Sequence, residues 1–164
     1  MDSITLWGWE KKKRTMLRYI KAGDIFCFQY DENTYCFGRI ISRLDIGTPS
    51  EIFDYTSDVP VISESDIVNA KRMFHPVNLD VYSLFDRKYT DVMGEWRIIG
   101  NHENYVPIDA DKIGFWFGGF PPRYKIDIFG NQSNISEIEA KDLQDFAVFG
   151  DIHIKDLVDE YLGR

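Results

Sequence analysis

Two neighbouring stretches near the beginning of the chain have the alternating pattern of paired β-strands. Large apolar side chains recur at alternate positions on one face of each stretch: Phe26, Phe28 and Tyr30 in residues 24–30, and Tyr35, Phe37 and Ile41 in residues 34–41. Successive side chains of a strand point to opposite faces, so this period of two predicts strands. The polar residues 31–33 between them predict a short turn. Both faces of the hairpin are largely apolar, and we therefore expect it in the middle of a sheet or barrel.

Further strands and two helices are predicted along the rest of the chain. Short apolar or aromatic stretches favour strands at residues 50–55, 79–85, 95–99, 113–117 and 124–129. Ser65 predicts the start of a short helix through residues 66–72, because an acidic beginning and a basic end agree with the helix dipole. The loosely helical apolar spacing of residues 151–162, followed by Gly163, predicts a C-terminal helix.

Together these elements favour a mainly β (α+β) fold. We expect a strongly bent antiparallel sheet or a small SH3-like barrel, with one or two packed helices including the C-terminal helix. Gly23 and Gly38 are placed where the backbone of such a sheet bends. The chain has 164 residues, of which 44% are hydrophobic and 15% aromatic, enough for one sizeable core. We expect a single domain over residues 1–164, and the composition excludes a disordered chain or a multidomain enzyme.

The charge is negative and unevenly distributed. The formal net charge is -8, with 19 Lys and Arg against 27 Asp and Glu. Residues 1–25 nevertheless carry six basic and three acidic side chains, a net charge of +3, which leaves -11 for the remainder. Proteins that bind nucleic acid generally carry an excess of basic residues, whereas this chain has an excess of acidic ones. We therefore expect no direct contact with nucleic acid.

Neither a membrane segment nor a secretion signal is visible in the sequence. No stretch reaches the length of apolar residues that a membrane helix needs, and the first residues lack a basic stretch followed by an apolar one. We therefore expect a soluble, cytoplasmic protein with no membrane partner. Cys27 and Cys36 lie on the two arms of the predicted hairpin, and in the cytoplasm we expect reduced, buried thiols, with a disulfide as the alternative.

Residues that could carry out chemistry are few. His75, His102 and His153 have no His or Cys at metal-ligand spacing, so we expect neither a metal nor another cofactor. The chain has no nucleophile motif, and its cysteines lie in apolar strands where a thiolate is disfavoured. Asp109 and Asp111 form a possible acid/base pair, although a chain with 27 acids has several such pairs by chance.

Acidic residues gather in two runs that contain few bases. The first has no base between its members, which are Asp54, Asp58, Glu64 and Asp66. The second extends from Glu137 to Glu160 and holds eight acids and two bases. Each run is either a solvated acidic surface or a docking surface for a basic partner, since opposite potentials accelerate association.

Four short motifs resemble the immunity protein 26 family. They are a basic lead-in, Lys12-Lys13-Arg14, followed by the strand of residues 21–28 with Gly23-Asp24; the return strand of residues 35–41 with Gly38-Arg39; the aromatic strand Ile52-Phe53-Asp54-Tyr55; and the Gly-x-Trp segment of residues 94–101. The motifs have the family's order and extend over roughly the first two-thirds of the chain.

This resemblance implies an antitoxin that binds a toxin delivered by neighbouring bacteria, as in contact-dependent growth inhibition. Such a protein blocks the cognate C-terminal toxin domain stoichiometrically and is not an enzyme. An acidic inhibitor suits the basic cleft of a nuclease, so we expect a nuclease toxin. We expect the toxin contacts among carboxylates in or beside predicted loops: Asp54, Asp58, Glu64, Asp66, Asp109 and Asp111.

Two other functions remain open from the sequence. A small acid/base hydrolase predicts a deep pocket that holds a carboxylate of raised pKa. An SH3-like module for peptides or nucleic acid predicts a groove lined by exposed aromatic rings such as Trp7, Trp9 and Trp116.

Overall fold

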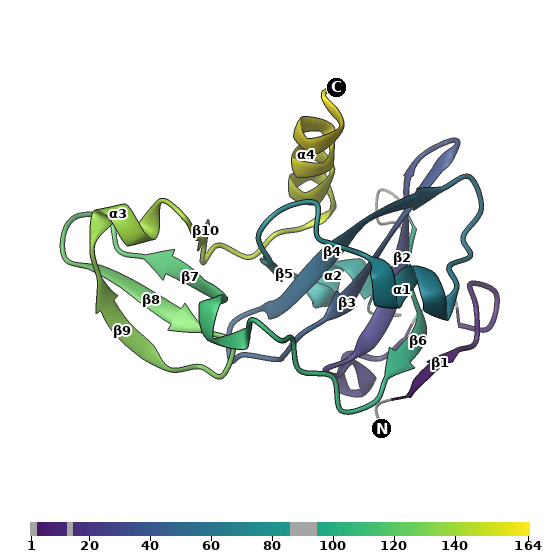
Figure 1. Ribbon diagram of the computed structural model, residues 1–164, viewed down its shortest axis with the longest axis horizontal. Helices are drawn as coiled ribbons and strands as arrows, with labels where there is room; N and C mark the ends of the chain where they lie inside the picture. Colours follow the sequence, from purple (N-terminus) through teal and green to yellow (C-terminus); the bar gives the residue numbers. More distant parts are fainter. Residues whose placement is uncertain (1–2, 13–14, 86–94) are drawn as a thin grey trace.

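The computed structural model describes residues 3–12, 15–85 and 95–164 and contains two sheets. Figure 1 shows the larger sheet as the body of the molecule and the smaller one projecting from it as an arm, residues 114–146. The body sheet has the order β1-β6-β2-β3-β4-β5 and consists of β1 (Ile4–Leu6), β2 (Asp24–Asp31), β3 (Thr34–Ile40), β4 (Thr48–Ser57), β5 (Val77–Leu79) and β6 (Trp96–His102). The arm sheet has the order β10-β7-β8-β9 and consists of β7 (Gly114–Phe117), β8 (Arg123–Asp127), β9 (Gln132–Ile135) and β10 (Gln144–Asp145).

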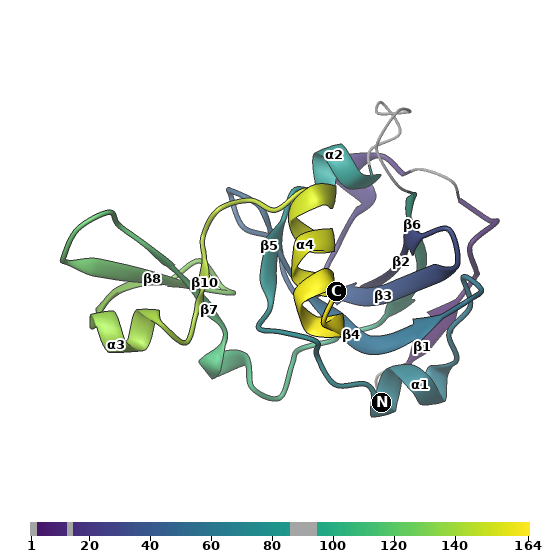
Figure 2. The same ribbon diagram turned by 90° about the horizontal axis from the view of Figure 1, so that it is seen from above.

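Short helices connect and cover the strands. The body carries α1 (Glu64–Asn69), α2 (Val81–Phe85), α4 (Asp151–Leu162) and the 3-10 turn η1 (Leu17–Tyr19). The arm carries α3 (Glu137–Ala140), and a second 3-10 turn, η2 (Ala110–Lys112), leads into it. Figure 2, seen from above, shows α4 lying across the body next to β3 and β4, with α1 beyond the other side of the sheet.

The hairpin of β2 and β3 lies in the middle of the body sheet, which confirms the prediction from its two apolar faces. Phe26 pairs with Gly38 and Phe28 with Cys36, and β6 and β4 complete the pairing on either side. Cys27 and Cys36 are buried, free thiols that belong to different cores on opposite faces of the sheet. The sheet therefore separates the two sulfur atoms.

The mainly β fold is confirmed, in the form of a strongly bent antiparallel sheet. Register shifts interrupt three strand pairs, β2–β3, β2–β6 and β3–β4, and such bulges bend and twist a sheet. Among the described residues, the edge strands β1 and β5 do not pair with each other, so the sheet stays open. The alternative of a closed SH3-like barrel is therefore wrong.

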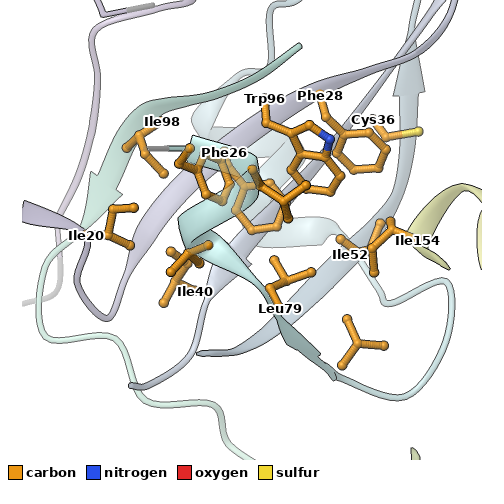
Figure 3. Close-up of a cluster of buried hydrophobic side chains, with 14 of the residues drawn as sticks. Ile20, Phe26, Phe28, Cys36, Ile40, Ile52, Leu79, Trp96, Ile98 and Ile154 are labelled. Atoms are coloured by element: carbon orange, nitrogen blue, oxygen red, sulfur yellow. The ribbon is translucent and has the colours of Figure 1, made fainter. Parts of the chain in front are cut away.

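Aromatic packing dominates the larger of the two body cores. Figure 3 shows Phe28 lying against Trp96, and the two rings are stacked with centroids 4.0 Å apart. The indole N–H of Trp96 donates to Asp151 at 2.7 Å, which fixes the start of α4 over this core. Ile154 and Val158 of α4 are fully buried there. Burial of each such apolar side chain contributes about 1.5–3 kcal/mol relative to an exposed position, so α4 is an integral part of the body.

One strand prediction and one helix prediction are corrected, and the C-terminal helix is confirmed. Residues 79–85 do not form one strand: β5 ends at Leu79, and α2 follows from Val81 to Phe85. The first body helix spans residues 64–69 instead of 66–72, because Ser63 and not Ser65 accepts the backbone N–H of Asp66 in a capping box. The C-terminal helix extends over residues 151–162, and Gly163 ends it in the left-handed conformation. Residue 94, at the start of the Gly-x-Trp motif, lies outside the described residues.

The arm is a small antiparallel unit with two different faces. The side chains of Trp116 and Arg123 lie on the face that α3 covers. On the other face Phe117 stacks on Tyr124, with centroids 5.2 Å apart. At the arm's root, Ile113 and Ile128 pack against Ile41 of the body in a third buried cluster. Strand β9 and helix α3 have no counterpart in the sequence predictions.

Candidate functional site

A buried carboxylate lies at the centre of a polar network in the body. Glu51 on β4 pairs in register with Arg39 on β3, on the sheet face opposite the Trp96 core. Its side chain is only 4% exposed. It accepts three hydrogen bonds, from Arg39 Nε at 3.0 Å, Arg72 Nε at 2.8 Å and the hydroxyl of Tyr105 at 2.6 Å. These donors replace the water that a buried carboxylate loses.

Arg72 extends this network to a second carboxylate near the surface. Its Nη1 donates to Asp109 Oδ2 at 2.6 Å and its Nη2 to Asp109 Oδ1 at 3.0 Å, a bidentate pair. Burial acts to lower the pKa of Arg72, but the bonds and charges of Asp109 and Glu51 outweigh it and raise that pKa. In return, the hydrogen bond from Arg72 holds the pKa of Asp109 below its usual value.

The Gly38-Arg39 pair on β3 explains how a cation comes to lie beside Glu51. The guanidinium of Arg39 lies 3.6 Å from the centroid of the Tyr105 ring and also donates from Nη1 to His102 Nδ1 at 2.9 Å. The preceding Gly38 leaves no room for a side chain, because a Cβ there would overlap the carbonyl oxygen of Glu51 and the ring of Phe26. The Gly-Arg pair thus lets β3 approach β4 closely while it places a cation beside Glu51.

The network fixes a loop that we call the clamped loop, residues 103–111. Tyr105 attaches it to Glu51 and Asp109 attaches it to Arg72. Between these two anchors the side chain of Ile108 is fully exposed, and Val106 is exposed as well. Beside these contacts lies an open cleft with an empty volume of about 810 Å³, which the loop and residues 70–72 line together and which has Lys71 and Ile108 on its walls. A rigid loop that presents an apolar side chain suits docking on a partner, because little conformational entropy is lost on binding.

Of the six predicted contact residues, some are hydrogen-bonded to other parts of the protein and others have no such partner among the described residues. Asp54 accepts the backbone N–H of Lys71, the residue before Arg72, at 2.9 Å. Asp66 belongs to the capping box of α1. The exposed carboxylates of Asp58, Glu64 and Asp111 have no side-chain hydrogen bond or ion pair with any described residue. We call the surface formed by the clamped loop, α1 and the outer end of β4 the acidic face.

Sequence reasoning missed the residues that organise this face: Arg39, Glu51, Arg72, Tyr105 and Ile108. Their separations in the chain are large; Arg72 and Asp109, for example, are 37 residues apart. One signal was present, because Gly38-Arg39 is part of the motif that resembles the immunity family. An arginine on an apolar strand needs a buried anion, so Arg39 in this motif points to a partner such as Glu51.

The geometry gives little support to the hydrolase alternative. The hydrolase alternative predicts a carboxylate of raised pKa, and burial does raise the pKa of the Asp24 carboxyl. Its two oxygen atoms, however, accept the backbone N–H of Lys21 at 2.9 Å and the side-chain amide of Asn101 at 2.9 Å. Asp24 therefore holds β2 to the neighbouring chain segments.

The three tryptophans of the SH3-like alternative do not share a groove. Trp7 donates its indole N–H to the carbonyl of Ile98 at 3.0 Å. Trp9 packs edge-on against Tyr35, and Trp116 lies in the arm. All three rings are half-buried, at separate places.

Within residues 3–12, 15–85 and 95–164, no helix is long and apolar enough to cross a membrane. The same ranges contain no group of three or more His, Cys, Asp or Glu side chains that could hold a metal ion.

Comparison with known proteins gives a family match. The family model described as Immunity protein 26 matches residues 21–118, which is more than half of the chain. The matched range begins before β2 and ends just after β7, so it includes the network around Glu51 but not β8, β9, α3, β10 or α4. No curated protein and no solved structure gives a significant match.

Proposed function

Because the chain belongs to the immunity protein 26 family, we propose that it neutralises one cognate bacterial toxin by binding to it. In this proposal the partner is the C-terminal domain of a toxin that neighbouring bacteria deliver by contact-dependent growth inhibition. The inhibitor acts in the cytoplasm as a single domain, in a stoichiometric complex and without chemistry of its own.

The observation that carries the proposal is the clamped loop with its exposed Ile108. Protein interfaces concentrate their binding energy in a few buried anchors that polar residues surround. Ile108 has the position of such an anchor, and the carboxylates of Asp109 and Asp111 follow it in the same loop. We therefore propose toxin contacts at Asp54, Asp58, Glu64, Asp66, Asp109 and Asp111, with Asp54, Asp66 and Asp109 also shaping the surface.

A nuclease is the toxin class that this surface fits best. A nuclease cleft carries basic residues that bind phosphates, and carboxylates on an inhibitor can occupy the same positions. The net charge of -8 also attracts a basic partner over a distance.

Coexpression with the adjacent gene tests the function. The C-terminal domain encoded by the neighbouring open reading frame is expressed with and without this protein, and growth, nucleic-acid integrity and complex stoichiometry are measured. We expect growth inhibition and nucleic-acid cleavage by the domain alone, and rescue through a 1:1 complex. Persistent toxicity without a complex would contradict the immunity function, whereas rescue of a toxin that leaves nucleic acids intact would contradict only the nuclease assignment.

A further inference from the structure

A groove with a mixed lining lies where the arm joins the body, and its polar members are Arg43, Asp45 and Gln132. One wall is the loop between β3 and β4, with Leu44 and Ile46, and the other is the β8–β9 end of the arm, with Ile126 and Phe129. The groove has an empty volume of about 760 Å³. At its rim Ile46 is 61% exposed and Phe129 is 66% exposed. Two large apolar side chains thus face solvent from opposite walls of one hollow.

Both walls are held by hydrogen bonds that do not involve the exposed side chains. Asp127 accepts the backbone N–H groups of Phe129 and Asn131, each at 2.9 Å, which fixes the turn that carries Phe129. Arg43 Nη1 donates to the carbonyl of Ile20 at 2.7 Å and anchors the opposite loop. The groove is therefore largely formed before any partner arrives.

We propose that this groove is a second docking site for the same toxin, and that it receives an apolar side chain of the toxin. The inference rests on the proposed function, which supplies the partner. The position of the groove supports the proposal. The buried cluster at the root of the arm, which consists of Ile41, Ile113 and Ile128, also packs against two residues of the clamped loop, Tyr105 and Ala110. The groove and the acidic face thus lie next to one small core, and one partner can contact both.

Charge favours the toxin over a second copy of this chain as the occupant. Two copies would each bring a net charge of -8 to the contact, and like charges oppose association. A basic toxin would instead be attracted to this negatively charged protein.

The arm also gives the groove a role in partner choice. Phe129 and Ile126 lie beyond residue 118, where the family match ends, whereas Leu44 and Ile46 lie within it. One wall therefore belongs to the part that matches the family and the other to the part that does not. Contacts on the second wall are suited to distinguishing the cognate toxin from the toxins of relatives.

Two matched variants test the groove. Ile46→Asp places a charge on the groove wall, and Ile138→Asp places the same charge on α3, on the opposite face of the arm. Both side chains are exposed, at 61% and 76%, so neither change disturbs a core. Binding to the inactivated C-terminal toxin domain of the neighbouring open reading frame is measured by calorimetry, and the oligomeric state by analytical ultracentrifugation.

We expect Ile46→Asp to weaken toxin binding about tenfold or more, and Ile138→Asp to change it less than about twofold. Equal affinities for the two variants, with tight wild-type binding, would overturn the groove proposal and leave the immunity function standing. A wild-type dimer that Ile46→Asp dissociates would assign the groove to a second copy and also overturn it. Absence of wild-type binding would instead contradict the proposed function itself.

Discussion

Arg72 and Asp109 form a bidentate ion pair that joins the segment after α1 to the turn before the arm. Arg72 also donates to Glu51, whose other partners are Arg39 and Tyr105. One arginine thus links the buried centre of the body to the loop that presents Ile108. The shape of the acidic face depends on this pair.

Removal of Arg72 should destabilise the protein. In Arg72→Ala the buried Glu51 loses one of its three donors, and we expect the free energy of unfolding to fall by about 2–3 kcal/mol. Urea unfolding followed by tryptophan fluorescence measures this change. Arg164→Ala is the matched control, because the Arg164–Asp31 pair is solvent-exposed and should leave the unfolding midpoint almost unchanged. Equal stabilities of the two variants would contradict the role of the network.

The Asp109 carboxylate should make stability depend on pH in the acid range. Arg72 lowers the folded-state pKa of Asp109 below its ordinary value of 3.8. A lowered folded pKa stabilises the protein fully above the unfolded pKa, and this contribution disappears as the pH falls through the folded pKa. The stability difference between wild type and Asp109→Asn should therefore be constant above about pH 5 and shrink below about pH 4.

Urea midpoints between pH 7 and pH 2.5 measure this difference. Asp111→Asn, in the same turn but without the contact to Arg72, serves as the control and should remain close to wild type throughout. If the stability difference between wild type and Asp109→Asn grew as the pH fell, the predicted direction of the Asp109 pKa shift would be wrong.

Gly38 should tolerate no side chain, because β3 and β4 approach closely there. A Cβ at this position would overlap the Glu51 carbonyl oxygen and lie 2.5 Å from the Phe26 ring. We expect Gly38→Ala to destabilise the fold by about 2–3 kcal/mol through overpacking. Gly119→Ala is the matched substitution at an open position, where a Cβ meets nothing within 4 Å. Thermal unfolding compares the two, and a Gly38→Ala variant as stable as Gly119→Ala would contradict this packing.

The two thiols should be unreactive while the protein is folded. Burial raises the pKa of Cys36 to about 12 and also raises that of Cys27. The reactive species is the thiolate, so we expect no labelling by a disulfide reagent at pH 8 and labelling of two thiols per chain in urea. Rapid labelling of either thiol in the folded protein would show that these strands open readily.

The sequence predicted the elements whose pattern is local. The period of two in β2 and β3 and the Gly163 stop after α4 each depend on a short stretch of residues. The single strand predicted for residues 79–85 is wrong, because a short apolar run fits a buried strand and a buried helix equally well. In the structure Asp80 lies between strand β5 and helix α2. Its carbonyl accepts the backbone N–H of Leu84 at 3.2 Å in the first turn of α2.

The candidate site depends on contacts that the sequence does not reveal. In the sequence Asp109 is one of many acids, and its partner Arg72 is the basic end of a predicted helix. Their meeting requires β4, the segment after α1 and the clamped loop to come together around Glu51. Ile108 stood in a polar loop without any pattern, so its exposure followed only from the positions of Tyr105 and Asp109.

The central claim is that a toxin docks on the acidic face. Its most direct test compares two triple charge reversals that change the net charge equally. The first replaces the three acids of this face that have no side-chain partner among the described residues: Asp58→Lys, Glu64→Lys and Asp111→Lys. The control replaces three exposed acids on α4 and the β2–β3 turn: Glu32→Lys, Asp156→Lys and Glu160→Lys.

The measurement is the affinity of each variant for the inactivated toxin domain as a function of salt concentration. We expect the reversal on the acidic face to weaken binding at least tenfold more than the control and to remove most of its salt dependence. Equal losses in the two variants, or wild-type affinity and salt dependence in the first, would contradict docking on this face.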